Sequence, residues 1–505
     1  MCPYRLLILI SALFFASVPV AQATWLDDLN YYREMANIQP VTENAAWSGW
    51  CWKHSRYVVK NDAWGHFENP GLPWYTPEGD YAARHSNLTY GSRLTLLDKE
   101  MIQAWMKGPF HALGMIDPKL LQVGFASYRE DIGTTKAVGT LDVLSGRGPI
   151  PPSVSYPVMW PANGKTVDLR SYHGLERPDP LTSSPGYTAP TGLPITLQIG
   201  PGNVLVNVSG SSFSVGGASL EHFTIDETDY YNPNAEVQAQ ERASLNSRDA
   251  IILIPKKPLA EGHEYAASIT ANGTTYRWSF KVKETKKPAV KLDAPFVSTK
   301  TSKRPTFRIS WKATDPYPSS GIHSYTVRYR PANSRDWMNW KVNTTSTYGY
   351  FKGAAGRTYY FRVRVKDNDG NYGWSKVMKT IVPYNEGANI RKKIGFNGYY
   401  KKGKSSNYLT SVRYSYKRGH TLVYRLDNTN GIGLVTTKSS NRGRAKIYVD
   451  GKYFKTVDAH SSKHKPRQLI FYKGFKKKGT HFLKIINKGT PGRTRFDVDA
   501  IVAGR

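Results

Sequence analysis

Cysteine is nearly absent from this 505-residue sequence, which has only Cys2 and Cys51. Cys2 lies within residues 1–23, where Arg5, an apolar core and a terminal Ala-Gln-Ala predict a secretory signal peptide that is removed before Thr24. The mature chain then keeps one cysteine, so an intrachain disulfide is excluded. Cys51 stands among three tryptophans in "WSGWCWKH", which favours a buried thiol over a reactive one.

Long apolar runs and catalytic motifs are missing as well. After residue 23 no stretch approaches the roughly 18 unbroken apolar residues of a membrane-spanning helix, so no membrane span is expected. The sequence lacks a Gly-rich phosphate loop, an HExxH helix, a CxxC pair and a nucleophile elbow. Cys51 and His54 are three residues apart on one predicted helix, which does not fit a Cys–His catalytic pair. No catalytic residue is therefore assigned from motifs.

Acidic residues are scarce in the last quarter of the chain. Residues 386–505 carry 28 Lys and Arg against 6 Asp and Glu, whereas residues 24–150 carry 12 against 14. The net charge of +32 therefore comes mostly from the C-terminal end. For an exported chain we expect anionic envelope polymers or polysaccharides as partners, and no nucleic acid. The candidate polymer-binding residues are Lys392, Lys393, Lys401, Lys402, Lys404, Lys476, Lys477, Lys478, Tyr399 and Tyr400.

The sequence divides into segments of different pattern. Residues 24–145 combine helical periodicity, as in "LDDLNYYREMANI", with alternating strands such as "LQVGFASY", which predicts an α/β/α sandwich. Residues 146–194 are rich in Pro and Gly and are interpreted as a structured linker. The linker receives no function, although it contains Trp160, Tyr172, His173 and Glu176.

Three β-rich segments complete the predicted multidomain architecture. Residues 195–285 resemble bacterial Ig-like sandwiches, and residues 286–385, with "SYTVRYR" and "TYYFRVRVKDNDGNYGWS", resemble a fibronectin type III module. Residues 386–505, with "YVDGKYFKTVD", resemble the jelly-roll, carbohydrate-binding-type modules of exported bacterial proteins. The stretch "DNDGN" allows a calcium loop or a hairpin turn. It lacks the distal Glu of an EF-hand, and Asp-Gly between strands favours the turn.

Five short motifs stand in a recognisable order in the first segment: "LNYYREMANIQPV", "WKHSRYVVKND", "GHFENP", "SNL" and "IQAWMKGPFHALGMIDPKLLQVGF". In this order they resemble the bacterial branch of the CAP superfamily (SCP-type domain), named for cysteine-rich secretory proteins, antigen 5 and pathogenesis-related 1. The resemblance covers about 105 residues. It implies an open groove lined by two histidines and two acids, which in some members holds a divalent cation.

The resemblance assigns candidate groove residues one by one. His66 in "GHFENP" and His111 in "GPFHA" match the paired histidines, and His54 matches the helix histidine of bacterial members. Asn87 matches the Asn of the Gly-Glu-Asn loop. His85 and Trp105 are also expected to line the groove.

The expected acids are where the sequence departs from the family. "AARHSNL" places His85 or Ser86 where the loop glutamate belongs, and Lys107 occupies the region of the other acid. Glu68 and Glu78 are candidates to replace the missing carboxylate. Paired histidines favour zinc as the cation, whereas the lack of a carboxylate that the sequence clearly assigns to the site weakens the zinc assignment.

Two functions of different class remain open. One is a secreted or cell-wall-associated CAP-domain protein that binds a small apolar or glycan ligand in its groove and anionic or glycan polymers through its basic module. The alternative is a metal-assisted hydrolase of envelope polymers, with His66 and His111 as ligands and Glu68 or Glu78 as base. A carboxylate within reach of both imidazoles is the feature that would separate them.

Overall fold

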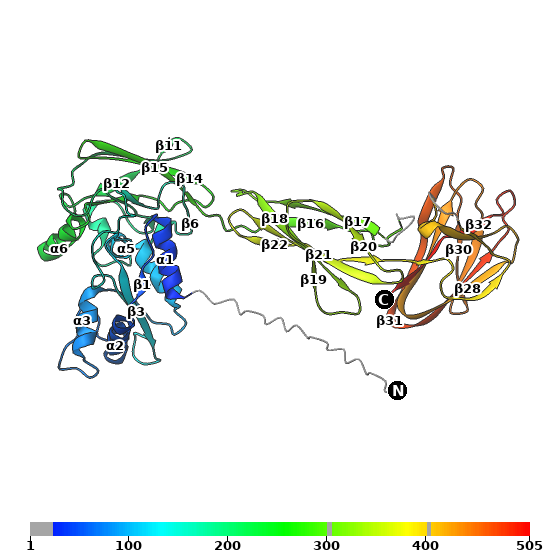
Figure 1. Cartoon of the computed structure of the whole chain (residues 1–505), viewed down its shortest axis with the longest axis horizontal. Coiled ribbons are helices and arrows are strands. Elements are labelled where there is room, and N and C mark those ends of the chain that lie inside the picture. Colours follow the sequence, from blue (N-terminus) through cyan, green and yellow to red (C-terminus); the bar gives the residue numbers. More distant parts are fainter. Residues whose placement is uncertain (1–23, 300–305, 401–405) are drawn as a thin grey trace, which may run out of the picture. The chain divides into compact units, whose positions relative to one another are not determined.

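The computed structural model describes residues 24–299, 306–400 and 406–505 (Figure 1). The chain forms two compact units, Met1–Lys283 and Glu284–Arg505. The predicted signal peptide and Lys401, Lys402 and Lys404 lie outside the described residues, as do the side chains of Tyr399 and Tyr400. Within the described ranges, no helix has both the length and the apolar character needed to cross a membrane.

The first unit begins with a four-stranded sheet of order β1-β3-β4-β2. Its strands are β1 (Thr42–Glu43), β2 (Ser86–Gly91), β3 (Gln122–Arg129) and β4 (Ala137–Asp142). Its helices are α1 (Trp25–Met35), α2 (Ala45–Asn61), α3 (Pro77–His85), α4 (Asp98–Lys107) and α5 (Pro109–Met115). Strand β1 runs parallel to β3, and the other pairs are antiparallel.

Helices cover both faces of this sheet. Every residue of β4 is buried. Leu141 belongs to the core that contains α1 and α4, whereas Val138 packs with Tyr57 and Val58 of α2. Successive residues of a strand face opposite sides, so the odd and even positions of β4 serve two separate layers. The predicted α/β/α sandwich is confirmed, with α2 and α3 on one side and α1 and α5 on the other (Figure 1).

Two residues of the quoted motifs explain how these layers hold together. A Cβ at Gly124, in the "VGF" of β3, would lie 2.5 Å from the backbone of Trp47, so glycine permits the close approach of α2 to the sheet. Arg33 of α1 is fully buried, and its guanidinium donates to the carbonyls of Met115 at 2.7 Å and Leu120 at 3.1 Å. Arg33 therefore fixes α1 to the end of α5.

Residues 146–283 form a β sandwich of two sheets, with strand orders β11-β10-β14-β15-β6 and β12-β13-β9-β5. The elements before the first long strand are β5 (Val158–Trp160), β6 (Thr166–Val167), β7 (Ser171–Tyr172), η1 (Pro180–Ser183), β8 (Thr191–Gly192) and β9 (Ile195–Gln198). The others are β10 (Val208–Val215), β11 (Ala218–Ser219), β12 (His222–Ile225), α6 (Ala235–Asn246), β13 (Ala250–Pro255), β14 (Glu264–Ala271) and β15 (Thr274–Val282).

The segment 146–194 belongs to this sandwich, which corrects its interpretation as a linker. Strand β5 pairs with β9, and β6 pairs with β15, so the segment supplies one edge strand to each sheet. Trp160 of β5 is fully buried, and its ring meets that of Tyr32 of α1 edge to face at 5.5 Å. One hydrophobic core runs from α1 through β5 to β15. The sandwich and the preceding domain thus share a core, which fixes their relative positions within the first unit.

The second unit begins with another β sandwich, whose sheets have the orders β16-β17-β20 and β19-β18-β21-β22, with β23 also paired to β21. The strands are β16 (Ala289–Asp293), β17 (Thr306–Thr314), β18 (Ile322–Pro331), β19 (Met338–Thr344), β20 (Tyr348–Lys352), β21 (Thr358–Asp367), β22 (Tyr372–Trp374) and β23 (Met378–Ile381). Phe361, Val363 and Val365 alternate inward along β21 and form the centre of its core.

The C-terminal module is also built from two sheets, with orders β24-β33-β28-β31-β29-β30 and β26-β27-β32, and with β25 paired to β28. The first half contains β24 (Tyr384–Asn385), β25 (Ile390–Ile394), β26 (Asn397–Tyr400), η2 (Tyr408–Thr410), β27 (Ser411–Ser415) and β28 (Thr421–Lys438). The second half contains β29 (Arg444–Val449), β30 (Lys452–Asp458), β31 (Lys465–Asn487), β32 (Phe496–Val498) and β33 (Ala500–Gly504). Their inward-facing aliphatic and aromatic side chains form one core.

Candidate functional site

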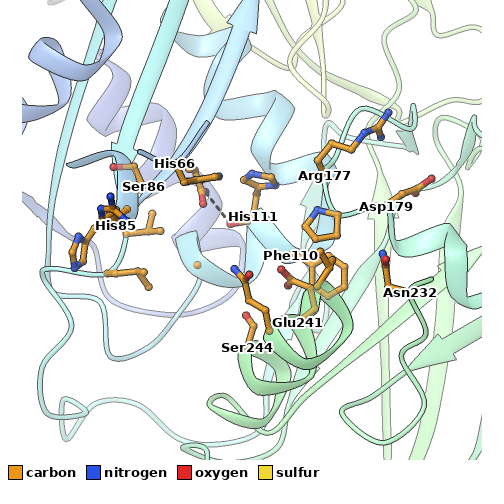
Figure 2. Close-up of a pocket in the computed structure, with 18 of the residues that line it drawn as sticks. His66, His85, Ser86, Phe110, His111, Arg177, Asp179, Asn232, Glu241 and Ser244 are labelled. Atoms are coloured by element: carbon orange, nitrogen blue, oxygen red, sulfur yellow. Dashed lines mark hydrogen bonds between the residues drawn. The ribbon is translucent and has the colours of Figure 1, made fainter. Parts of the chain in front are cut away.

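A cavity of about 720 Å³ lies between the α/β/α domain and the sandwich that follows it in the first unit (Figure 2). One wall comes from the end of α3, the start of β2 and α5. The opposite wall comes from the 177–182 segment and from α6. The sequence predicted an open groove, whereas the shared core places the second domain across it. The residues that line this cavity include His66, Asn87, His111, Arg177, Glu241 and Ser244.

His111 stands near the start of α5 because Gly108-Pro109 ends α4 and begins the next helix. Proline is well suited to the first position of a helix, where its missing N–H needs no partner. His111 occupies the third position, whose backbone N–H has no acceptor inside the helix. That N–H donates to Oε1 of Glu176 at 2.8 Å, and Nδ1 of the same histidine lies 2.8 Å from the same oxygen.

Glu176 is the carboxylate that the sequence analysis left without a role. Its side chain is almost completely buried, and its second oxygen, Oε2, has no hydrogen-bond partner among the residues that the structure describes. A Cβ at Gly108 would lie 2.6 Å from Oε1, so this glycine leaves the space that the carboxylate fills. Burial raises the pKa of Glu176, and the hydrogen bond from His111 opposes that rise. The pair therefore holds the His111 ring in one orientation.

The ring of His66 is also held through Nδ1. This atom lies 3.0 Å from the carbonyl oxygen of Ala83, which can only accept a hydrogen bond, so Nδ1 is the donor. In a neutral imidazole the lone pair then resides on Nε2. The protein surrounding the ring replaces much of its water and lowers its pKa, and the positive forms of His111 and His54 would lower it further. His66 and His111 line the same cavity (Figure 2).

These two rings fit the chemistry of a divalent cation in one respect. Histidine ligands of metals usually donate one ring N–H to a carbonyl or carboxylate, and both His66 and His111 do so. The loop glutamate expected from the family is replaced by His85 or Ser86, and Oε1 of Glu176 already accepts hydrogen bonds from His111. The site therefore offers the Nε2 atoms of His66 and His111 as ligands, while Glu176 binds the Nδ1 side of the His111 ring.

The opposite wall supplies a further acid, Glu241 of α6. It is buried and lines the cavity together with Gln240 and Ser244, one helical turn apart. Burial, and then the negative charge of Glu176, raise the pKa of Glu241 to about 7. A carboxyl group with such a pKa exchanges its proton near neutral pH, which suits hydrogen bonding or proton transfer to a bound molecule.

The other candidate residues divide into two groups. Asn87 and His85 line the cavity; Asn87 donates to the carbonyl of His111 at 3.1 Å, and the His85 ring stacks on Tyr81 at 4.0 Å. The remaining candidates lie outside the cavity lining and are His54, Glu68, Glu78 and Trp105.

Each member of the second group has a structural role instead. His54 and Glu68 are both fully buried and form their own pair at 3.1 Å. Glu78 forms a surface ion pair with Lys53 at 3.2 Å. Trp105 is a core residue whose indole N–H donates to the carbonyl of Leu88 at 3.0 Å. The expectation that Trp105 lines the groove is corrected, because its amphipathic helix turns the ring inward.

The basic residues of the C-terminal module occupy two places on its large sheet. Lys392 and Lys393 are exposed on β25, opposite Val423 and Leu422 of β28. Lys476, Lys477 and Lys478 are exposed in β31. Residues 475–478 lie between the partners of Thr429 and Gly431, so they bulge out of the ladder. The surface contains cations at both places, whereas the tyrosines at 399–400 have no described side chains.

Comparisons with known proteins agree with the domain pattern. The model of the cysteine-rich secretory protein family, CAP, matches residues 26–139, and that of the fibronectin type III domain matches residues 293–381. No curated protein matches the sequence.

Several solved structures are similar to parts of the chain. A family 35 carbohydrate-binding module from an environmental isolate is 16% identical, covering 24% of this chain and 93% of its own, with a TM-score of 0.19. The fibronectin(III)-like modules of Clostridium thermocellum CbhA are 14% identical, covering 45% and 93%, with a TM-score of 0.19. The chicken CNTN1 FN1–FN3 domains are 10% identical, covering 62% and 95%, with a TM-score of 0.20. These likenesses are too weak to indicate a function.

The family matches, the α/β/α sandwich and the ordered motifs agree with one another. The chain carries a CAP domain of the cysteine-rich secretory protein family at its N-terminus, and a fibronectin type III domain stands among the β sandwiches that follow it.

Proposed function

We propose that this protein acts outside the cell as a glycan-binding protein, with a polar ligand held in the cavity between the CAP domain and the β sandwich of residues 146–283. The observation that carries the proposal is the joint lining of that cavity by His66, His111 and Glu241. Asn232, Gln240 and Ser244 add further hydrogen-bonding groups, whereas Phe110, Val143 and Leu144 add apolar surface. Sugars present hydroxyls at their edges and C–H groups on their faces, so this mixture suits them better than a wholly apolar ligand.

A variant that fills the cavity tests this proposal. Ser244→Phe places a ring into the cavity from α6, whereas Ala243→Phe places the same ring on the exposed side of that helix. We expect the first variant to lose binding to soluble cell-wall glycan fragments in calorimetric titration and the second to retain it. Equal binding by both variants, with folding unchanged, would show that the ligand does not occupy this cavity.

Metal-assisted hydrolysis of envelope polymers is the second candidate. It is favoured by the fixed Nδ1 atoms of His66 and His111 and by the carboxyl of Glu241 with its pKa of about 7. Bound zinc would supply a Lewis acid there. The two Nε2 atoms would hold the ion, and Glu241 would give or take a proton. Zinc binding by these histidines is tested by zinc titration of the full chain and of His66→Ala, with His323→Ala as the control. Equal zinc binding by the His66 variant removes this candidate.

The basic C-terminal module supports a separate part of the proposal, namely attachment to anionic envelope polymers. Lys392, Lys393 and the 476–478 run present exposed cations from one sheet. Cations that neutralise a polyanion release its counterions, which gives binding that weakens steeply with salt. The chain would then be held at the cell surface while the CAP cavity receives its ligand.

A further inference from the structure

Three carboxylates converge at the start of the second unit, far in the sequence from the histidines of the CAP domain. Glu284 is the first residue of the unit, Asp315 follows β17, and Asp367 ends β21. Each side chain offers one oxygen, and the three oxygens lie within 4.8 Å of one another. Glu284 and Asp367 are fully buried, and Asp315 is half-buried.

The groups that donate hydrogen bonds to the three acids are neutral. Asp367 accepts from the backbone N–H of Asn371 at 2.7 Å through Oδ1. Asp315 accepts from the N–H of Gly321 at 2.8 Å through Oδ2. Glu284 accepts from the side-chain amide of Asn371 at 3.1 Å. Among the described residues no Lys, Arg or His forms an ion pair with any of the three acids.

Two oxygens of the cluster are buried, and no amide, hydroxyl or cationic donor of the described residues reaches them. They are Oδ2 of Asp367 and Oδ1 of Asp315. A buried carboxylate oxygen with neither a donor nor a cation costs several kcal/mol, so native structures rarely leave one unpaired. Burial raises the pKa of Glu284, and a side-chain hydrogen bond with Asp367 and the negative charges of Asp315 and Asp367 raise it further. The arrangement lacks a positive charge.

The spacing of the oxygens matches one ion. Calcium binds oxygens at roughly 2.3–2.6 Å, so two of its ligands lie at most about 5 Å apart. Three carboxylates and no imidazole or thiol favour a hard cation over zinc. Calcium also accepts irregular geometry and completes its shell with water, whereas magnesium demands a near-ideal octahedron.

The "DNDGN" stretch of the sequence enters this cluster through its first aspartate. The stretch forms the hairpin between β21 and β22, with Gly370 at a φ of +89°, as Asp-Gly turns do. The turn therefore forms, and it also carries an acid into the cluster. The other two acids, Asp315 and Glu284, are 52 and 83 residues away in the sequence, so no local sequence motif contains all three.

We propose that Glu284, Asp315 and Asp367 form a calcium site that joins the segment entering the fibronectin type III domain to two loops at one end of its sandwich. Glu284 N–H donates to Asp369 at 2.8 Å, which holds the entering segment against the hairpin. The ion would bind the same three chain segments more firmly. This site is independent of the CAP cavity and of the polymer-binding module.

Calorimetric titration of the EDTA-treated full chain with calcium chloride alone tests the site. We expect one site in the wild-type protein that Asp315→Asn and Asp367→Asn each weaken at least ten-fold. The matched control is Asp336→Asn, at an exposed aspartate of the same domain, which should bind as the wild type does. His66→Ala should also leave calcium binding unchanged, which separates this site from the CAP cavity.

Thermal unfolding in EDTA shows whether the variants fold. Replacing one of three like charges by a neutral amide should leave the transition of this domain unchanged or raise it, and only the wild type and the controls should gain from added calcium. Calcium binding that persists in folded Asp315→Asn or Asp367→Asn, or that disappears in His66→Ala, overturns the proposal. The half-exposed Asp315 provides the decisive variant if Asp367→Asn does not fold.

Discussion

The Nδ1 atom of His111 lies 2.8 Å from Oε1 of Glu176, a residue 65 positions later in the chain. The CAP domain supplies the ring, and the first part of the next sandwich supplies the acid. Because one core joins the two domains, the position of this carboxylate relative to His111 depends on how the domains pack.

Glu176→Gln tests how much this acid contributes to the site. The amide oxygen of a glutamine can still accept the hydrogen bonds from His111, but it has no charge to orient and polarise the imidazole. Loss of such a partner typically weakens a metal site about 10- to 100-fold, and we expect zinc affinity to fall by that factor in calorimetry. Glu78→Gln, at an exposed acid outside the cavity, is the control. Unchanged zinc affinity in Glu176→Gln would show that this acid has no part in metal binding.

Glu241→Gln should change the pH dependence of stability. The pKa of Glu241 is raised from 4.5 to about 7 in the folded chain, so the folded state keeps a proton that the unfolded state releases between these values. The stabilising contribution is therefore complete below pH 4.5 and is lost as the pH rises through 7. The whole difference corresponds to about 3 kcal/mol.

The variant lacks this titration, so we expect it to match the wild type near pH 4 and to exceed it by up to ~3 kcal/mol at pH 8. Urea unfolding at both pH values measures the difference. Glu236→Gln, exposed on the same helix, should behave alike at both. A Glu241→Gln difference that is independent of pH would contradict the raised pKa.

Arg33→Lys should destabilise the first unit by about 3 kcal/mol. The guanidinium of Arg33 donates to the carbonyls of Gln39, Met115, Asp117 and Leu120. A lysine ammonium cannot reproduce this planar fork and would leave buried carbonyls unpaired. Urea unfolding measures the loss, and Arg56→Lys, whose guanidinium lies over surface Trp52 at 4.5 Å, is the control. Equal stability of the two variants would contradict the role assigned to Arg33.

The triple variant Lys476→Gln, Lys477→Gln and Lys478→Gln should weaken binding of the full chain to anionic cell-wall polymers. Binding by the wild type should fall steeply between about 50 and 200 mM salt, and the variant should depend less on salt because it releases about three fewer counterions. Co-sedimentation with cell walls measures both. The same change at the exposed Lys291, Lys312 and Lys352 of the fibronectin type III sandwich is the control. Salt-independent binding would indicate recognition of a neutral glycan.

Several features of the fold were predictable because they depend on residues close in sequence. Helical periodicity in "LDDLNYYREMANI" predicted the first helix, which forms at Trp25–Met35. The helix at Pro109–Met115, after the Gly108-Pro109 break, was not predicted. Alternation of apolar residues predicted strands such as β21. The segment 146–194 was taken for a linker because its strands are only two or three residues long, too short to show alternation.

The residues of the candidate site were predictable in part. His66, His111, Asn87 and His85 stand in motifs that resemble those of the CAP family, and all four line the cavity. Glu176 and Glu241 belong to no such motif. The local sign of Glu176 was Gly108, three residues before His111, because a glycine at this position leaves the space that the carboxylate fills.

The sequence by itself determined the order of the domains, the helices and strands of the CAP domain, the paired histidines and the concentration of positive charge after residue 386. These depend on local periodicity, on motif order and on composition. The tertiary structure alone decided that Glu176 meets His111 and that the β sandwich of residues 146–283 lies across the groove. It alone brings together three acids that are 31 to 83 residues apart in the sequence. Such contacts depend on how domains pack and loops meet, which no short stretch of sequence specifies.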